Sequence, residues 1–388
     1  MQISHDNLSP FPTNPDEYSQ SHKQQRNNNH IYTIKNLLYT RINSLKSSNY
    51  IKALLFGDNK LDKEIKTSYQ IISHLFSVSG FHINFITSII YFYLDRVTYN
   101  KKIKYITVDI FLVLYLLLCN TTSLLRCTVM NILLSINHLL KINIKKIDIV
   151  LLTLILCIII NPFIIYDIGF IYSYTISFFL YKNKYKTNNK LLKIIYISLI
   201  SFLVSLPINI YTSYEINFLS IILNIIIVPI VSLILLPLSL LTLIFPILDN
   251  ILYLITSILE KISLYTSNIN IFKQILSKPS IILIIIYYLV IILILSKNKH
   301  YYLILILLIF HKTIPLYNSN LEVVMFDVGE ADSMLISTPS KKVNILIDTG
   351  RGIDINNIII YLKSIGISKL NYLIITHGDE DHIGGALY

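Results

Sequence analysis

The sequence predicts a mostly α-helical, polytopic membrane protein with about eight to ten spans, followed by an incomplete α/β domain. Hydrophobic residues make up 54% of the 388 residues and charged residues only 14%, whereas ordinary soluble domains carry about 25% charged residues. The apolar residues form runs long enough to cross a bilayer, which takes about 20 of them. Residues 321–388 differ, because they combine charge and glycine with short β-type runs.

The net charge is +11, from 33 Lys and Arg against 22 Asp and Glu. A basic balance is typical of proteins that bind nucleic acid or anionic lipid, but in a membrane protein the same residues also set topology from the cytoplasmic loops. Lysines at positions 182, 184, 186 and 190 therefore predict a cytoplasmic loop. The three cysteines lie in or beside apolar runs and fit neither a disulfide framework nor a cysteine metal motif.

The chain divides by composition into three parts. Residues 1–52 are polar and partly of disordered composition, residues 53–316 form the predicted membrane domain, and residues 317–388 form the α/β part. The predicted spans are 71–94, 106–119, 124–140, 149–166, 194–211, 216–231, 233–248, 281–296 and 301–314. The stretch 169–181 is short for a crossing and is expected to be re-entrant. The stretch 251–265 carries Glu260 and Lys261 and is expected to lie in the interface.

The α/β part shows short apolar runs separated by turn residues. Strands are predicted at 323–328, 333–337, 343–348 and 372–375, with a helix at 354–364 between the third and the fourth strand. The last strand ends in Thr376-His377. This order predicts a sheet that is covered on one face by a helix.

The densest cluster of chemical groups is His377-Gly378-Asp379-Glu380-Asp381-His382. Two imidazoles and three carboxylates within six residues are costly unless a cation neutralises them. In an extended stretch His377 and Asp379 project to one side, and Asp381 and His382 then turn the other way as a helix begins, so the pattern allows two adjacent metals with separate ligand sets. A two-metal centre generates hydroxide and clamps a phosphodiester, and Asp381 is the candidate catalytic residue. Glu380 is expected to face solvent, and the alternative is a solvated acidic loop.

This segment resembles the metal motif of the metallo-β-lactamase-fold hydrolases, with Asp379 in place of the middle histidine. The upstream stretches 326–333 and 347–350 resemble the strand and turn signatures of that fold. A metal motif with this aspartate, which follows a polytopic membrane region in the chain, resembles that of the ComEC-type DNA-internalisation competence family. That resemblance implies an α/β metallo-β-lactamase-type domain and a two-metal site for Mn or Zn, with His377, Asp379, Asp381 and His382 as ligands.

The membrane region carries further elements of the same family in the same order. They are Leu55-Phe56-Gly57-Asp58, Ser79-Gly80-Phe81-His82, Ser123-Leu124-Leu125-Arg126, Asp167-Ile168-Gly169-Phe170 with Ser177, Leu206-Pro207, and Asn224 with Pro229. The resemblance covers residues 53–388. It implies a competence-type transmembrane channel domain at 53–316.

The candidate residues of the channel and DNA path are Ser79, Gly80, His82, Arg126, Asp167 and Asn224. An ionisable group at membrane depth is costly, so it should face a partner or a watery cavity. Arg126 and backbone donors freed by broken helices could contact the phosphates of a single strand. The alternatives are a hydrogen-bonded interior histidine for His82, a snorkelling side chain for Arg126, and a loop-solvated carboxylate for Asp167.

A domain of this fold needs on the order of 200 residues, so the α/β part is expected to be its N-terminal half only. The metal shells are expected to be incomplete, with weak metal binding and little cleavage by this chain alone. The resemblance implies DNA uptake in natural transformation through a channel in the bacterial plasma membrane, with several crossings. The alternatives are a membrane-tethered metal-dependent nuclease and a solute transporter or inactive remnant. The expected partners are single-stranded DNA, the membrane, a competence DNA receptor, a cytoplasmic helicase-like ATPase and further copies in an oligomer.

Overall fold

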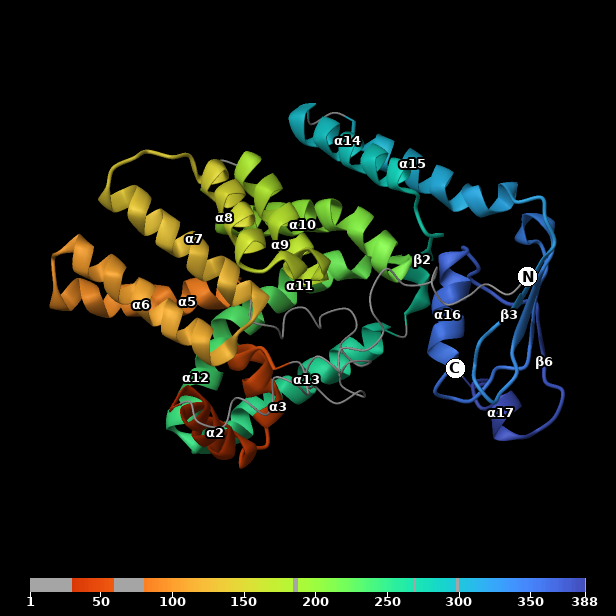
Figure 1. Ribbon diagram of the computed structural model, residues 1–388, viewed down its shortest axis with the longest axis horizontal. Coiled ribbons are helices and arrows are strands. Elements are labelled where there is room, and N and C mark those ends of the chain that lie inside the picture. The colour runs from red at the N-terminus through yellow and green to blue at the C-terminus, as the bar shows by residue number, and fades with distance from the viewer. Residues whose placement is uncertain (1–29, 59–79, 184–187, 268, 298–299, 388) are drawn as a thin grey trace. The chain divides into compact units, whose positions relative to one another are not determined.

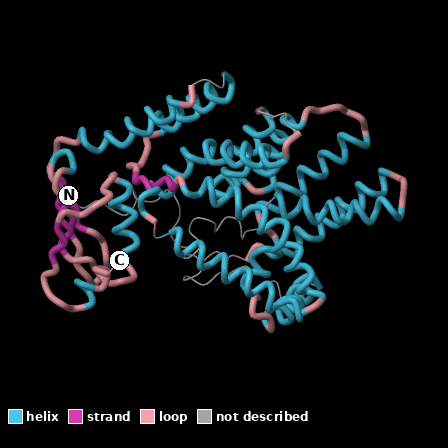
Figure 2. The backbone as a smooth tube through the Cα atoms, turned by 180° about the vertical axis from the view of Figure 1, so that it is seen from behind, coloured by secondary structure: helices cyan, strands magenta, loops and turns pink. Residues whose placement is uncertain are grey.

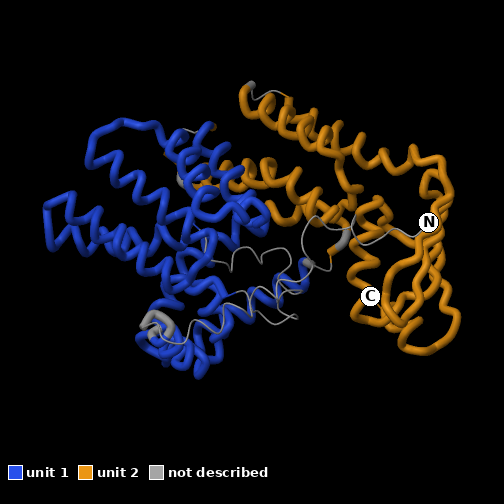
Figure 3. The backbone as a smooth tube through the Cα atoms, viewed as in Figure 1, with its two compact units in different colours: residues 1–182, 222–268 blue, residues 183–221, 269–388 orange. Residues whose placement is uncertain are grey.

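The computed structural model of the chain describes residues 30–58, 80–183, 188–267, 269–297 and 300–387 (Figure 1). Helices dominate this part of the chain, and strands occur in a two-stranded and a four-stranded sheet (Figure 2). The chain divides into two compact units that alternate along the sequence (Figure 3). Unit 1 consists of Met1–Lys182 and Ile222–Asn268, and unit 2 of Asn183–Ile221 and Ile269–Tyr388.

Unit 1 is built from helices. In chain order they are α2 (His30–Asn43), α3 (Ser48–Ile51), the π-helical turn η3 (Lys52–Phe56), α5 (Gly80–Val97), α6 (Lys101–Cys119), α7 (Thr122–Leu139), α8 (Lys146–Ile160), the 3-10 turn η5 (Pro162–Tyr166), α9 (Ile168–Lys182), α11 (Leu219–Ile230, of which the first three residues belong to unit 2), the π-helical turn η6 (Val231–Leu235), α12 (Leu236–Ile244), the 3-10 turn η7 (Pro246–Leu248) and α13 (Asp249–Ser267). Side-chain caps fix some of the starts. Asn100 accepts the backbone N–H of Lys102 at α6, and Thr121 accepts that of Leu124 at α7.

One helix continues through two prolines. The sequence predicted separate spans at 216–231 and 233–248, but Leu219–Ile244 is a single helix of 26 residues in which η6 joins α11 to α12. The prediction of two spans here is therefore wrong. A proline lacks the N–H of an α-helical bond, and a π-helical turn between Pro229 and Pro237 lets the helix change register without ending.

Two helices in the described ranges are long and apolar enough to cross a membrane. They are Leu191–Ser213 and Leu219–Ile244, with mean hydropathies of 2.2 and 2.9. Only 22% and 33% of their most apolar stretches are buried inside the structure, so most of this apolar surface faces outward. Shorter apolar helices lie at Ile281–Ser296 and Tyr302–Tyr317. The predicted eight to ten spans are not confirmed by these lengths and compositions. The stretch 169–181, expected to be re-entrant, lies in the continuous helix α9.

Unit 2 begins with helices and a small sheet. Its elements are α10 (Lys190–Ser213), β1 (Glu215–Asn217), the 3-10 turn η8 (Asn270–Phe272), β2 (Lys273–Ile275), α14 (Ile281–Lys297), α15 (Tyr302–Thr313) and the 3-10 turn η9 (Ile314–Tyr317). Strands β1 and β2 pair antiparallel, with Ile216 opposite Gln274. Their core is apolar, and it holds Leu206, Ile210, Ile216, Leu276, Leu283, Tyr287 and Leu307.

The α/β part of unit 2 has the predicted order of elements. It contains β3 (Glu322–Met325), β4 (Met334–Ser337), the 3-10 turn η10 (Pro339–Lys341), β5 (Asn344–Ile347), α16 (Ile355–Ser364), β6 (Tyr372–Ile374) and α17 (Glu380–Ile383). The sheet order is β3-β4-β5-β6, and β6 runs parallel to β5 after the crossover through α16. The prediction of three strands, a helix and a fourth strand is confirmed.

The helix α16 covers one face of this sheet. Leu335 of β4 and Leu346 of β5 form a core with Ile358 and Leu362 of α16. Because β5 and β6 are parallel, their carboxyl ends meet at one edge of the sheet. The residues that follow these two strands are therefore brought together.

Candidate functional site

The site begins where β5 and β6 end. Asp348 follows β5, and its backbone N–H donates to Ile374 O at 2.8 Å. Its carboxylate accepts two hydrogen bonds from Thr376, at 2.8 Å from the backbone N–H and 2.7 Å from the hydroxyl. Asp348 is 3% exposed and has φ +55°, a left-handed conformation that Asp tolerates better than most residues. These bonds fix the start of the histidine loop to the neighbouring strand.

Asp348 also orients His382. The Oδ2 of Asp348 lies 2.9 Å from His382 Nδ1, so the imidazole is held at one nitrogen by a buried carboxylate. The His382 carbonyl accepts from the backbone N–H of Thr349 at 2.8 Å and from its hydroxyl at 2.9 Å. A carboxylate on one ring nitrogen leaves the other ring nitrogen for a metal, which is the usual arrangement of metal-binding histidines.

The pKa values of this pair move in opposite directions. Burial alone would raise the pKa of Asp348, but hydrogen bonds from the Thr376 backbone, His382 and the Thr376 hydroxyl outweigh it and hold that pKa below its ordinary value. The hydrogen bond to Asp348 raises the pKa of His382, with smaller contributions from the charges of Asp381, Asp348 and Asp332. Both shifts favour a charged pair when no metal is bound.

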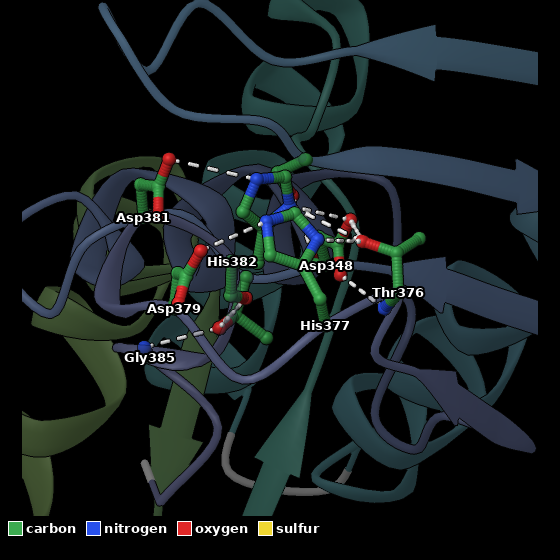
Figure 4. A network of polar contacts seen from close by, with 9 residues as sticks. Asp348, Thr376, His377, Asp379, Asp381, His382 and Gly385 are labelled. Atoms are coloured by element: carbon green, nitrogen blue, oxygen red, sulfur yellow. Dashed lines mark hydrogen bonds and ion pairs between the residues drawn. The ribbon is translucent and has the colours of Figure 1, made fainter.

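The side chains of His377, Asp381 and His382 converge (Figure 4). Ligand atoms of His377, Asp381 and His382 all lie within 4.8 Å of one another. The two imidazole centroids are 3.6 Å apart, and Asp381 Oδ2 lies 3.5 Å from His382 Nε2. Two imidazoles and a carboxylate are donors that zinc and manganese both accept, so these residues fit one divalent cation.

The arrangement differs from the two separate ligand sets that the sequence suggested. His377 lies with Asp381 and His382, whereas Asp379 is outside this group, with its Oδ2 3.5 Å from His377 Nε2. The physical reason is that residues 376–379 form bends rather than an extended stretch, so alternation of side chains does not apply. Glu380 is exposed, as expected.

Two glycines allow α17 to approach the turn before α16. A Cβ on Gly384 would lie 2.5 Å from Glu380 O and 2.7 Å from Gly352 N, and one on Gly385 would lie 2.9 Å from Ile355. The Gly385 N–H donates to the Thr349 hydroxyl at 3.0 Å. Gly384 is therefore required by close packing of backbone on backbone, and Gly385 by close packing against the Ile355 side chain.

Asp348, Thr349 and Thr376 were missed as site residues by sequence reasoning. Asp348 and Thr349 were noted only as part of a turn after a strand, and Thr376 only as the end of one. The usable signal was a carboxylate directly after one parallel strand and a threonine directly after the next. Their contact depends on the β5–β6 pairing, which the sequence did not specify.

Motif residues from three helices meet in unit 1. Arg126 of α7 is 9% exposed, and its guanidinium donates to Ser177 Oγ of α9 at 3.3 Å. A Cβ on Gly80 of α5 would lie 3.0 Å from Arg126 Nη2. The guanidinium also lies 5.8 Å from the ring centre of Tyr174. Gly80, Arg126 and Ser177 belong to three separate motif elements, and the structure brings them together.

The other candidate residues occupy different places. His82 is 3% exposed. Asp167 caps α9, because its Oδ1 accepts the backbone N–H groups of Gly169 at 2.8 Å and Phe170 at 3.4 Å. Asn224 lies on α11, and its buried Oδ1 has no hydrogen-bond partner in the described chain. Ser79 lies outside the described residues.

Comparison with known proteins covers both regions. The Competence protein family model matches residues 54–300, and the Metallo-beta-lactamase superfamily model matches residues 326–388. The chain is 26% identical over 382 residues to "ComE operon protein 3" of Bacillus subtilis (strain 168). The alignment covers 88% of this chain and 49% of that protein. The chain thus spans about half the length of this curated relative, and no solved structure matches it. Since the first match takes in more than half of its residues, the chain belongs to the Competence protein family.

Proposed function

We propose that the protein acts in DNA uptake during natural transformation, as a plasma-membrane channel that passes single-stranded DNA to the cytoplasm. The observation that carries this proposal is the match of residues 54–300, nearly the whole helical region, to the Competence protein family. The outward apolar surface of Leu191–Ser213 and Leu219–Ile244 supports a membrane location. Several crossings, an oligomer, a DNA receptor and a helicase-like ATPase belong to the same proposal.

The test is a deletion strain complemented with the gene on a plasmid. Labelled double-stranded DNA is supplied, and label that resists external nuclease is measured beside surface-bound label. The proposal expects deletion to abolish protected label while surface binding persists, and complementation to restore it. Unchanged protected label in the deletion strain would reject a role in uptake.

A second candidate function is favoured by the cluster of His377, Asp381 and His382. This cluster supports a metal-dependent phosphodiesterase that degrades the strand not transported. A bound divalent cation would supply Lewis acidity and an activated water. His377, Asp381 and His382 would hold it, Asp348 would orient His382, and Asp381 is the candidate catalytic residue.

The two functions separate in one experiment. Purified full-length chain in detergent is incubated with labelled DNA and Mn²⁺ or Zn²⁺, with chelator as the blank. Metal-dependent strand loss that disappears in His377→Ala supports the enzyme. If a His377→Ala strain takes up DNA normally and the wild-type chain cleaves no DNA, only the channel function remains supported.

A further inference from the structure

Unit 1 contains a buried cation that has no anion beside it among the described residues. In the described part of the chain Arg126 forms no ion pair, and its contacts are Ser177 Oγ at 3.3 Å, Cys127 Sγ at 3.7 Å and the Tyr174 ring. Its Nε is buried and lacks a hydrogen-bond partner. A guanidinium has five N–H donors and stays charged in proteins, so neutral acceptors satisfy only part of it.

This arrangement is costly unless a ligand completes it. Buried charges in proteins are normally paired, because desolvation of an unpaired ion costs several kcal/mol. Arg126 also lies in the second turn of α7 (Thr122–Leu139), inside the helix bundle rather than on an outward face. A snorkelling arginine would extend toward solvent, whereas Arg126 is 9% exposed.

The surroundings match a phosphate group. The Ser177 hydroxyl accepts from Arg126 Nη1 and retains its own proton for a ligand oxygen. Gly80 lets α5 approach the guanidinium closely, because a Cβ there would lie 3.0 Å from Arg126 Nη2. The planar guanidinium fork suits two phosphate oxygens at once.

We propose that Arg126 and Ser177 form a binding site for a phosphodiester group of the transported single strand, with Gly80 allowing the guanidinium to pack close to α5. This inference rests on the proposed uptake function and names the residues that contact the strand. A phospholipid headgroup has the same phosphodiester chemistry. The inward position of Arg126, between α5, α7 and α9, favours a strand that passes inside the bundle over a lipid at its surface.

The test uses the full chain in nanodiscs of zwitterionic phosphatidylcholine. Binding of a fluorescent oligodeoxythymidylate of about 16 nucleotides, a typical upper site size, is followed by anisotropy at several salt concentrations. Arg126→Gln should bind about tenfold more weakly, and its log K against log salt should be shallower by about 0.7, one phosphate contact. Arg126→Lys should keep the wild-type slope, because one positive charge remains.

The matched control is Arg96→Gln, which removes an exposed arginine whose guanidinium lies 3.7 Å from the Phe92 ring centre. It should bind as the wild type does. An uncharged methylphosphonate oligomer should not distinguish Arg126→Gln from wild type. If the role of Arg126 is purely structural, Arg126→Gln should instead bind both oligomers more weakly to the same extent, with the slope of log K against log salt unchanged. That result would overturn the inference.

The remaining outcomes are separable. If wild type and Arg126→Gln bind the oligonucleotide alike, the phosphate site is wrong while the uptake function stands. If Arg126→Gln loses only co-purifying phosphatidylglycerol, detected by native mass spectrometry, the site belongs to lipid and the inference is also overturned. If wild type binds no oligonucleotide and deletion leaves uptake intact, both proposals fail.

Discussion

Asp348 holds the imidazole of His382 through the 2.9 Å contact between Oδ2 and Nδ1. Removing that carboxylate charge weakens the orientation and the basicity of the histidine. We expect Asp348→Asn to lower divalent-metal affinity about 10- to 100-fold, measured by calorimetric titration of the purified chain. Glu380→Gln, an exposed carboxyl change in the same loop, is the matched control. Equal affinity for Asp348→Asn and wild type would show that the buried pair does not support a metal.

The same pair predicts how the metal-free loop responds to pH. The raised pKa of His382 stabilises the fold below the ordinary imidazole pKa of about 6.5, and this stability is lost as the pH rises through the folded-state value. The lowered pKa of Asp348 stabilises the fold above the ordinary carboxyl pKa of about 3.9. This stability is lost as the pH falls through the folded-state pKa of Asp348. Hydrogen-exchange protection of residues 376–383, corrected for intrinsic rates, should be greatest between these limits. Protection that rises steadily above pH of about 7 would contradict this.

Gly384 and Gly378 form a natural pair for testing the close packing of the loop. A Cβ at Gly384 would meet backbone atoms at 2.5 and 2.7 Å, whereas one at Gly378 would meet nothing within 4 Å. Gly384→Ala should therefore cost about 1–3 kcal/mol, and Gly378→Ala much less. Thermal unfolding of the full chain, together with hydrogen exchange at 380–386, measures both. Equal effects would mean that the loop relaxes freely around residue 384.

At the scale of elements, the α/β part was largely predictable and the metal loop was not. Short apolar runs bounded by turn residues located β3 to β6, and helical spacing of apolar residues located α16. The grouping of His377 with Asp381 depends on bends after Ile374, which no local pattern specifies. Likewise, Pro229 and Pro237 suggested a break between two helices, but the π-helical turn η6 between them keeps Leu219–Ile244 one continuous helix.

The cap of α9 separates a structural from a functional role for Asp167. Asp167→Ala removes the acceptor of two backbone N–H groups and should destabilise the start of α9 by about 0.5–2 kcal/mol. Asp167→Ser should restore most of this stability, because serine is also a good cap. Hydrogen exchange over 168–172 reports the change. If Asp167→Ser restores protection but not DNA uptake, the carboxylate itself contributes to the DNA path.

On the scale of the whole molecule, we expect membrane insertion to depend on apolar surfaces that the described residues leave exposed. Ile226 of α11 is 54% exposed within the helix Leu219–Ile244. If that face contacts lipid, Ile226→Lys should disfavour insertion by about 2.5–3.5 kcal/mol. The protein should then shift from the carbonate-resistant membrane fraction to the soluble or degraded fraction, while Ile226→Leu should not. Unchanged insertion of Ile226→Lys would place this face in a watery or protein-lined environment.

The pairing of β5 with β6 has a consequence for biosynthesis. Strands β3, β4 and β5 can assemble as successive hairpins as soon as they leave the ribosome, but β6 must wait until the α16 crossover is complete. His382 and its anchoring carboxylate are 34 positions apart. A cation that arrives during translation would therefore meet His377, Asp381 and His382 together, but Asp348 can orient His382 only after β6 has docked on β5.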